Sequence, residues 1–266
     1  MKKIARICLI LLFAARTAHA VQCQMVEARG EVVVSNFTPE EAKALAIRQA
    51  RYEVIEKVSG VKVAGVTLVK DMALAGEFVK SMAKGYIRSE KILRWEQDKY
   101  QPTQKDFPVT TLRVVIEACV EPALPVKDPS FRVKAELNKA AFFEGEKPAL
   151  EITSNKKAYI HIFNLTADDK VWYHHEYIPQ IRMPLAIEPG QKLVYPPKGI
   201  ALPVSLPDGY KRGTEAFIIV ATRDDTDLSM LFKVKKEMSI PEFNNGLLSI
   251  AGDIVEEMVI YSVEKR

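Results

Sequence analysis

Three histidines, His161, His174 and His175, are the side chains that could most readily bind a metal ion or act as a general base. Glu176 follows them directly and could add a carboxylate ligand. Neighbouring side chains of a strand point to opposite faces, so in an extended segment His174 and His175 would not reach the same ion. We therefore expect no metal site here. A metal-dependent or hydrolytic enzyme that uses this histidine region is the alternative function.

Other catalytic arrangements lack the local sequence that they require. The glycines are scattered at expected turns and helix ends, so no phosphate-binding loop is formed, and no serine lies in a Gly-x-Ser-x-Gly segment. Catalysis by a cysteine and a histidine would need a free thiol. The sequence therefore predicts no catalytic residue, no metal and no cofactor.

The segment Trp172-Tyr-His-His-Glu-Tyr177 is the best candidate for a binding surface. Aromatic side chains with polar tips are enriched where proteins bind their partners. The predicted binding residues are Trp172, Tyr173, His174, His175 and Tyr177. The alternative is that Trp172 or Tyr173 packs in the core. The pattern does not decide which face of this expected strand meets solvent and which meets the core.

Two of the three cysteines, Cys23 and Cys119, are predicted to form a disulfide. Each lies opposite the apolar face of an expected strand, at 23–34 and at 109–120. If these strands are neighbours in one sheet, both sulfur atoms lie on the same outer face. The third cysteine, Cys8, lies in the predicted signal peptide described below, so an exported chain would keep an even number. This number permits the pairing, and the alternative is two free thiols.

The N-terminus has the pattern of an export signal. Basic residues precede an apolar run at 7–15, and Ala-His-Ala at 18–20 is a small-x-small cleavage site. This arrangement predicts a secretory signal peptide at 1–20. The apolar run is much shorter than the roughly 20 residues that span a bilayer. We therefore expect a periplasmic protein with no transmembrane segment in the mature chain.

Removal of the signal leaves a chain with balanced charge. The sequence holds 38 Lys and Arg against 34 Asp and Glu. Lys2, Lys3, Arg6 and Arg16 lie ahead of the cleavage site with no acidic residue, so 34 residues of each sign remain. No basic run is left to bind phosphate groups, and nucleic acid is not an expected partner.

The segment 21–122 is expected to form an α+β domain. Thr38-Pro-Glu-Glu41 is a capping box that begins a helix, and Gly60 follows the last turn of that helix. The order β-α-α-β-β predicts two helices on one face of a small antiparallel sheet. The expected elements are a strand at 23–34, helices at 38–59 and 71–84, and strands at 92–100 and 109–120.

The rest of the chain is expected to form a β-sandwich domain at 131–266, after a stiff proline-rich linker at 123–130. Residues 158–165 alternate with apolar groups on both faces, so this strand should lie between a core and a second covering layer. A short helix should begin at Ser239, and 256–263 could be a strand or a helix. The other expected strands are 131–137, 149–153, 170–177, 191–195 and 216–222.

Part of the first half resembles two families of envelope proteins. Ala44-x-Ala46-x-x-x-Ala50-x-x-x-Val54-x-x-x-Val58-x-Gly60, followed by Ser81-x-x-x-Gly85-Tyr-Ile87, is similar to the N-terminal domain of flagellar assembly protein T. It is also similar to the LPP type of small envelope lipoprotein, although the chain lacks a lipobox. The resemblance implies an assembly or scaffold role without catalysis, and a flagellar basal-body accessory protein is one alternative. An unrelated α+β domain is another.

The second half resembles a bacterial domain of unknown function that occurs in exported or envelope proteins. The similar segments are Ala158-Tyr-Ile-His-Ile-Phe163, Ile187-Glu-Pro-Gly190, Leu206-Pro-Asp-Gly209 and Glu215-Ala-Phe-Ile-Ile-Val-Ala-Thr222. Members of this family look like β-sandwich accessory or binding modules, and the family supplies no catalytic residue.

These patterns predict a non-catalytic, exported envelope protein that binds or scaffolds another cell-envelope component. The partner would be a protein or another envelope component, bound at a sheet edge or at 172–177. The sequence does not predict the oligomeric state.

Overall fold

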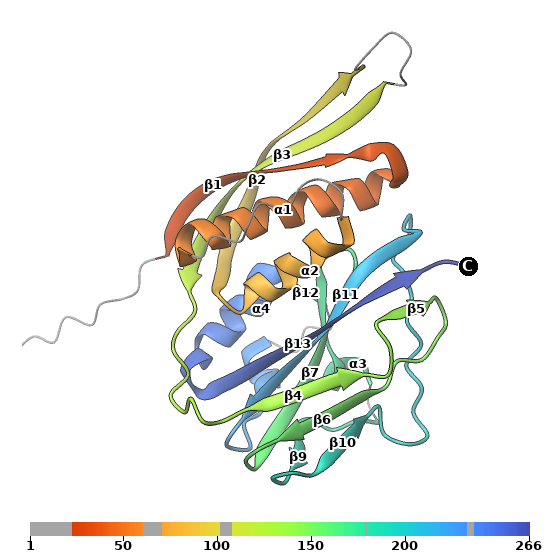
Figure 1. Cartoon of the computed structure of the whole chain (residues 1–266). Helices are drawn as coiled ribbons and strands as arrows, with labels where there is room; N and C mark the ends of the chain where they lie inside the picture. The colour runs from red at the N-terminus through yellow and green to blue at the C-terminus, as the bar shows by residue number, and fades with distance from the viewer. Residues whose placement is uncertain (1–22, 61–70, 102–107, 179, 233–236) are drawn as a thin grey trace, which may run out of the picture.

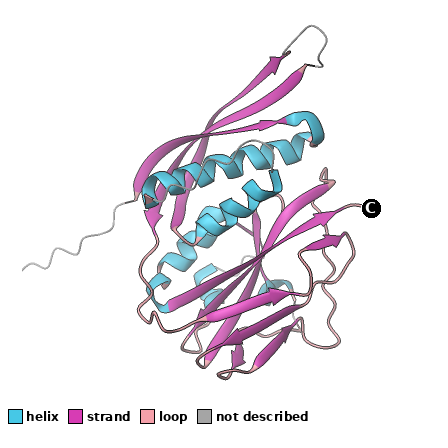
Figure 2. Ribbon diagram, viewed as in Figure 1, coloured by secondary structure: helices cyan, strands magenta, loops and turns pink. Residues whose placement is uncertain are grey.

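The structure is a computed structural model of the chain, and it describes residues 23–60, 71–101, 108–178, 180–232 and 237–266. The predicted signal peptide at 1–20 therefore lies outside the described residues. Helices and extensive sheets are both present, which confirms the mixed α+β class (Figure 2). Within the described residues, none of the helices combines the length and the apolar character that crossing a membrane requires.

The first half forms a three-stranded antiparallel sheet and two helices, in the order of elements that the sequence predicts. Strand β3 lies between β1 and β2. The predicted strand at 92–100 begins earlier, at Gly85, and the second helix ends at Met82 rather than at 84. The elements are β1 (Gln24–Val33), α1 (Pro39–Ser59), α2 (Asp71–Met82), β2 (Gly85–Tyr100) and β3 (Val109–Pro122).

Helix α1 has the predicted ends. The Thr38 hydroxyl accepts a hydrogen bond from the Glu41 backbone N–H at 3.2 Å, and the Glu41 carboxylate accepts one from the Thr38 N–H at 2.8 Å. These two bonds satisfy donors that the first turn leaves unpaired. Gly60 ends the helix with a φ of 69°, a left-handed conformation that glycine adopts without a steric penalty.

Small residues let α1 lie very close to β1. Ala42, Ala46 and Ala50 are completely buried on the helix. A Cβ atom at Gly30 of β1 would overlap the carbonyl oxygen of Ala46. The spaced alanines in the sequence therefore mark the side of the helix that packs closely on the strand.

In its described residues, the second half contains two sheets, two α-helices and two short 3-10 helices, Leu228–Phe232 and Ala251–Asp253. In the larger sheet the order is β12-β8-β7-β11-β13-β5, with β9 also paired to β7, and the smaller sheet has the order β10-β6-β4. The strands are β4 (Val133–Leu137), β5 (Ala141–Phe143), β6 (Leu150–Ser154), β7 (Ala158–Leu165), β8 (Lys170–Tyr173), β9 (Leu185–Ile187), β10 (Lys192–Tyr195), β11 (Arg212–Thr222), β12 (Glu237–Ser239) and β13 (Ile254–Glu264). The helices are α3 (His174–Tyr177) and α4 (Ile240–Leu248). The finer prediction of a β-sandwich stays a prediction.

The structure decides the secondary structure of two segments of this half. The last segment, which could have been a strand or a helix, is the strand β13. The predicted strand at 170–177 is wrong beyond Tyr173, because the chain turns there into the one-turn helix α3. The inference that His174 and His175 point to opposite faces of a strand fails for the same reason.

The helices α1 and α2 lie between the three-stranded sheet and the larger sheet (Figure 1). Helix α4 also joins the halves: the Asn245 side chain donates to the Arg88 carbonyl at 2.8 Å, and the Asn244 side chain donates to the Ile87 carbonyl at 3.2 Å. Buried apolar residues of both halves form one continuous cluster. The division into domains on either side of 123–130 stays a prediction.

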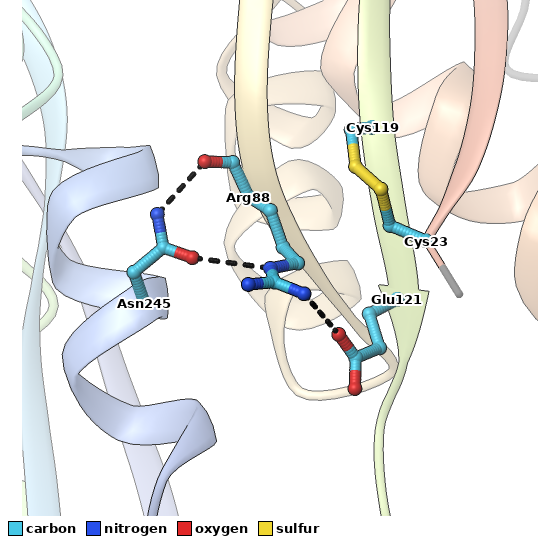
Figure 3. The surroundings of a disulfide bond; sticks show 5 residues. All are labelled: Cys23, Arg88, Cys119, Glu121 and Asn245. Carbon is cyan, nitrogen blue, oxygen red and sulfur yellow. Dashed lines mark hydrogen bonds and ion pairs between the residues drawn. A yellow bond between two sulfur atoms is a disulfide. The ribbon is translucent and has the colours of Figure 1, made fainter. Parts of the chain in front are cut away.

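Cys23 and Cys119 are paired as a disulfide on the outer face of the three-stranded sheet (Figure 3). Their Cα atoms are 5.4 Å apart, within the usual range for a disulfide. Met25 is the partner of Cys119 in the β1–β3 register, so Cys23 lies two residues further along on the same face. The predicted pairing, which was inferred from the alternation of side chains along each strand, is therefore confirmed by the positions of the two cysteines.

Candidate functional site

A cavity of about 290 Å³ opens on one face of the larger sheet. Strands β7, β8, β11 and β13 form its floor, and the irregular segment 202–207 forms the opposite wall. The residues that the floor contributes are Asn164, Trp172, Glu215, Phe217 and Tyr261.

Strand register explains why these five residues meet. Asn164 of β7 is paired with Trp172 on one side and with Phe217 on the other. Glu215 is paired with Tyr261 and lies two residues from Phe217, on the same face of β11. The neighbouring residue of β7, Phe163, points to the other face, where its ring packs against Phe243 of α4 at 5.1 Å between ring centroids. Both faces of β7 are thus covered near its centre, as its apolar pattern predicted.

Glu215 is the unusual member of this group. Its side chain is 1% exposed, and its oxygens accept hydrogen bonds from the Tyr261 hydroxyl at 2.8 Å and the Ala167 backbone N–H at 3.4 Å. Burial raises the pKa of Glu215 to about 7, against the hydrogen bonds with Tyr261, Ala167 and Asn164 and the more distant charge of Arg48, which favour the ionised form. Near neutral pH, Glu215 therefore exists in both protonation states.

The Tyr261 hydroxyl links this carboxyl to an amide. It lies 2.8 Å from Glu215 Oε2 and 2.9 Å from Asn164 Oδ1, yet it carries a single proton. When Glu215 is protonated, it can donate to Tyr261, and Tyr261 can donate to Asn164. When Glu215 is ionised, Tyr261 must donate to Glu215 instead. The hydrogen bonds of the cavity floor therefore change with the protonation of Glu215.

The cavity lining combines two carboxyls with aromatic and aliphatic side chains. Asp168 lines it together with Thr166, whose hydroxyl donates to Asp168 at 2.6 Å. Among the described residues that line the cavity, none is a lysine or an arginine. Trp172 and Phe217 supply aromatic surface. A cationic group would find two carboxyls and an indole ring here.

The predicted binding residues are divided between the cavity and the core. Trp172 and His174 line the cavity. Tyr173 is 1% exposed and stacks on a core phenylalanine, and His175 is half-buried and accepts a hydrogen bond from the Met183 N–H at 3.0 Å. The backbone of Tyr177 ends α3, and its side chain lies outside the described residues.

Two of the three histidines proposed for the enzyme alternative are hydrogen-bonded to separate tyrosines. His161 Nδ1 lies 2.7 Å from the Tyr173 hydroxyl, and His174 Nδ1 lies 2.5 Å from the Tyr195 hydroxyl. Burial lowers the pKa of His161 to about 4 and that of His174 to about 3, so both rings are neutral near pH 7. Throughout the described part of the chain, no three or more His, Cys, Asp or Glu side chains are grouped so that they could hold a metal.

Glu215, Tyr261 and Asn164 were not among the predicted site residues. The sequence did contain one indication of Glu215, because this residue directly precedes an apolar run of β11 and shares a face with Phe217. A carboxyl within a strand whose neighbours on both faces are buried is a candidate for a perturbed pKa.

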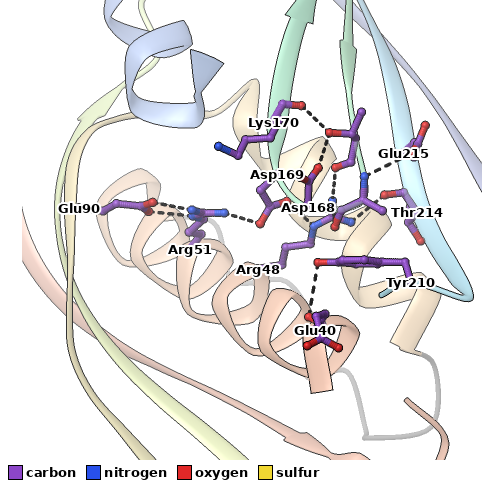
Figure 4. A network of polar contacts seen from close by, with 12 residues as sticks. Glu40, Arg48, Arg51, Glu90, Asp168, Asp169, Lys170, Tyr210, Thr214 and Glu215 are labelled. Carbon is purple, nitrogen blue, oxygen red and sulfur yellow. Dashed lines mark hydrogen bonds and ion pairs between the residues drawn. The ribbon is translucent and has the colours of Figure 1, made fainter. Parts of the chain in front are cut away.

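A second buried polar cluster joins α1 to the turn between β7 and β8 (Figure 4). The two carboxylate oxygens of Asp169 accept from Arg48 Nε at 2.6 Å and from Arg51 Nη1 at 2.5 Å. The Arg51 guanidinium also donates two hydrogen bonds to the Glu90 carboxylate of β2. Burial disfavours the Arg51 charge, but its acidic partners outweigh burial and raise its pKa. This cluster connects β2, α1 and the larger sheet.

The remaining donors of Arg48 are also occupied. Its Nη atoms donate to the carbonyl oxygens of Thr214 at 2.8 Å, Thr166 at 2.9 Å and Ala167 at 3.2 Å. Arg48 is only 2% exposed. Because its hydrogen-bond donors are committed to these groups, we assign this cluster to structure rather than to ligand binding.

A scan of known protein families found none whose model matches this chain, and a search of curated proteins found no match. The two family resemblances and the alternative of a flagellar accessory role therefore stay predictions.

Proposed function

We propose that this chain is a non-catalytic, exported binding protein that holds a cationic group of another envelope component in the cavity on the larger sheet. The observation that carries this proposal is the buried Glu215 carboxyl on the cavity floor. In the described structure, its hydrogen bonds are with Tyr261, Ala167 and Asn164, and none of these comes from a lysine or an arginine. A ligand ammonium or guanidinium group would supply the missing countercharge.

The physical reason is that ionised carboxylates are costly to bury without a partner. A cation in the cavity would favour the ionised form of Glu215, and the proton would leave to solvent. Trp172 would add a cation–π contact, and Phe217 would cover the aliphatic part of the ligand. Binding should therefore release a proton below pH 7 and become stronger as the pH rises through about 7, where Glu215 loses its proton.

Export is part of the same proposal. The Cys23–Cys119 disulfide supports it, because disulfides persist mainly in oxidising compartments such as the periplasm. The N-terminal signal pattern supports the same compartment.

The test uses two matched probes, N-acetyl-lysine amide and its neutral analogue N-acetyl-norleucine amide. The chain contains two tryptophans, so the Trp95→Phe variant leaves Trp172 in the cavity as the sole indole reporter. We expect the lysine probe to change the Trp172 fluorescence and the norleucine probe to bind far more weakly. Calorimetry in buffers of different ionisation enthalpy should detect proton release at pH 6.5.

Glu215→Gln is the matched variant, because glutamine keeps the shape of a protonated carboxyl but cannot ionise. It should lose both the preference for the lysine probe and the proton release. Equal binding of the two probes, or an unchanged preference in Glu215→Gln, would refute a cation site at this position.

A further inference from the structure

The far part of β2 forms an arm that leaves the body of the protein together with β3 (Figure 1). Strand β1 pairs with β3 from Val120 to Thr111, so most of 89–100 belongs to the three-stranded sheet, and only Lys99 and Tyr100 pair with β3 beyond the end of β1. Strand β2 is the last in the sheet order β1-β3-β2. Across the described residues, its outer edge is covered by α4 near Ile87 and Arg88 and has no strand partner beyond them.

This edge carries large apolar side chains in contact with solvent. Ile92 is 44% exposed, Leu93 36%, Trp95 38% and Tyr100 65%. Natural sheet edges are usually short, charged or covered, because a long apolar edge pairs readily with another strand. The segment 89–100 also carries six charged residues and a register shift at Leu93, so it is suited only to a partner strand whose charges match its own.

Register with β3 assigns the arm residues to two faces. Leu93 is the extra residue at a register shift between Ile92 and Arg94. The face that α1 covers in the body carries Glu90, Ile92, Trp95, Gln97 and Lys99. The outer face carries Lys91, Arg94, Glu96 and Asp98.

The charge pattern of the arm is self-complementary. If two copies of β2 pair antiparallel about a two-fold axis at Trp95, same-face neighbours are opposite each other across the new ladder. If Leu93 is the extra residue in this ladder too, as it is in the ladder with β3, three kinds of pair occur, each of them twice, and all join opposite charges: Arg94 with Glu96, Lys91 with Asp98, and Glu90 with Lys99. The two Trp95 rings meet at the axis.

Neighbouring registers match less well, because each keeps one kind of opposite-charge pair, Arg94 with Asp98 for an axis at Glu96 or Lys91 with Glu96 for an axis at Arg94. Moving the axis to Glu96 places two carboxylates opposite each other, and moving it to Arg94 places two guanidinium groups opposite each other. Like charges directly opposite each other destabilise a sheet. The three carboxylates already have partners within the chain: Arg51 binds Glu90, Arg94 binds Glu96 at 2.7 Å, and Arg113 binds Asp98 at 3.1 Å. Pairing between copies would therefore add to existing contacts, and its main effect would be to select the register.

We propose that this chain forms a two-fold symmetric dimer in which β2 of one copy pairs antiparallel with β2 of the other, centred on Trp95. The two three-stranded sheets become one six-stranded sheet, and the bodies lie at opposite ends of the paired arms. The unpaired backbone edge of β2 is then paired with a second copy of this chain. This assembly is independent of the cavity and of its ligand.

The test is a charge exchange at the exposed pair Lys91 and Asp98 in the disulfide-bonded chain. We expect the wild-type protein to sediment as a dimer in equilibrium with monomer. Lys91→Asp and Asp98→Lys, each alone, create two like-charge pairs per dimer and should weaken association about tenfold or more. The double variant restores opposite charges and should restore the dimer, which a simple loss of folding would not do. Circular dichroism checks that every variant keeps its fold.

A second measurement tests the axis. In Trp95→Cys the two new thiols meet at the two-fold axis, so mild oxidation should cross-link two copies, whereas Tyr100→Cys should not cross-link to itself. A monomeric wild-type protein at its highest soluble concentration would overturn the proposal. It would also be overturned by single variants that dimerise normally, or by a double variant no better than either single one.

Discussion

Two buried carboxyl groups lie near the same end of the larger sheet, and they are held in opposite ways (Figure 4). Asp169 receives one guanidinium group on each oxygen, from Arg48 and Arg51. Glu215 receives a tyrosine hydroxyl and a backbone N–H. The first group is matched in charge and fixes α1 to the sheet. The second is unmatched, and it faces a cavity. Both carboxyls are buried, so burial alone does not distinguish them. The presence or absence of a cationic partner distinguishes a structural carboxyl from one that can bind a proton or a ligand.

Removing the matched carboxyl should have the largest effect. Asp169→Ala leaves two buried guanidinium groups facing an apolar side chain, and breaking a buried ion pair in this way costs about 3–5 kcal/mol. Urea unfolding at pH 7 measures this loss. The control is Asp225→Ala, which changes an exposed aspartate and should alter the stability by less than about 0.5 kcal/mol. A loss below about 1 kcal/mol in Asp169→Ala would show that the cluster does not fix the helix.

Removing the unmatched carboxyl should instead change the pH dependence of stability. The folded-state pKa of Glu215 is about 7, so the folded protein binds more protons than the unfolded chain between about pH 4.5 and 7. The stability that Glu215 contributes is complete below about pH 4.5 and is lost as the pH rises through 7. This pKa difference corresponds to roughly 3 kcal/mol.

Glu215→Gln should therefore resemble the wild type near pH 4.5 and become progressively more stable than it up to about pH 7.5. Urea unfolding across this range in both proteins is the measurement. The buried histidines His161 and His174 also titrate on unfolding, with the opposite sign, but they are common to both proteins and cancel in the difference. A difference in stability that does not vary with pH would contradict the assignment.

The smallest expected effect comes from the hydroxyl that links the unmatched carboxyl to Asn164. The hydrogen bond from Tyr261 favours the ionised form of Glu215, so Tyr261→Phe should raise the pKa of Glu215 above 7. The cost in stability should be about 1 kcal/mol, the usual value for one hydrogen bond. Carbon NMR of the Glu215 carboxyl gives the pKa directly. A pKa that falls in this variant would exclude the proposed role of Tyr261.

The parts of the fold that the sequence predicted depend on local chemistry. The capping boxes at Thr38 and Ser239 each involve residues within one helical turn, and both are formed. The alternation of β7 and the shared face of Cys23 and Cys119 follow from the period of a strand. In these cases the residues that determine the structure are close in sequence or repeat with a fixed period.

The parts that the sequence did not predict depend on distant partners. Arg48 and Arg51 have the pattern of a solvated helix face, but α1 lies between two sheets, and their shared partner Asp169 is more than a hundred residues away. The cavity floor needs the register of β7, β8, β11 and β13, which period alone does not fix. The turn at His174 was also missed, because Trp172 and Tyr173 have strong strand propensity.

The disulfide has a mechanical consequence. A force applied to the chain ahead of Cys23 would pass through the two sulfur atoms directly into β3, the middle strand of its sheet, and not into β1 at the edge. An edge strand can be peeled away one pair of hydrogen bonds at a time, whereas a middle strand shares the load with neighbours on both sides. A tether attached ahead of Cys23 would therefore pull on the most firmly held strand of the first half.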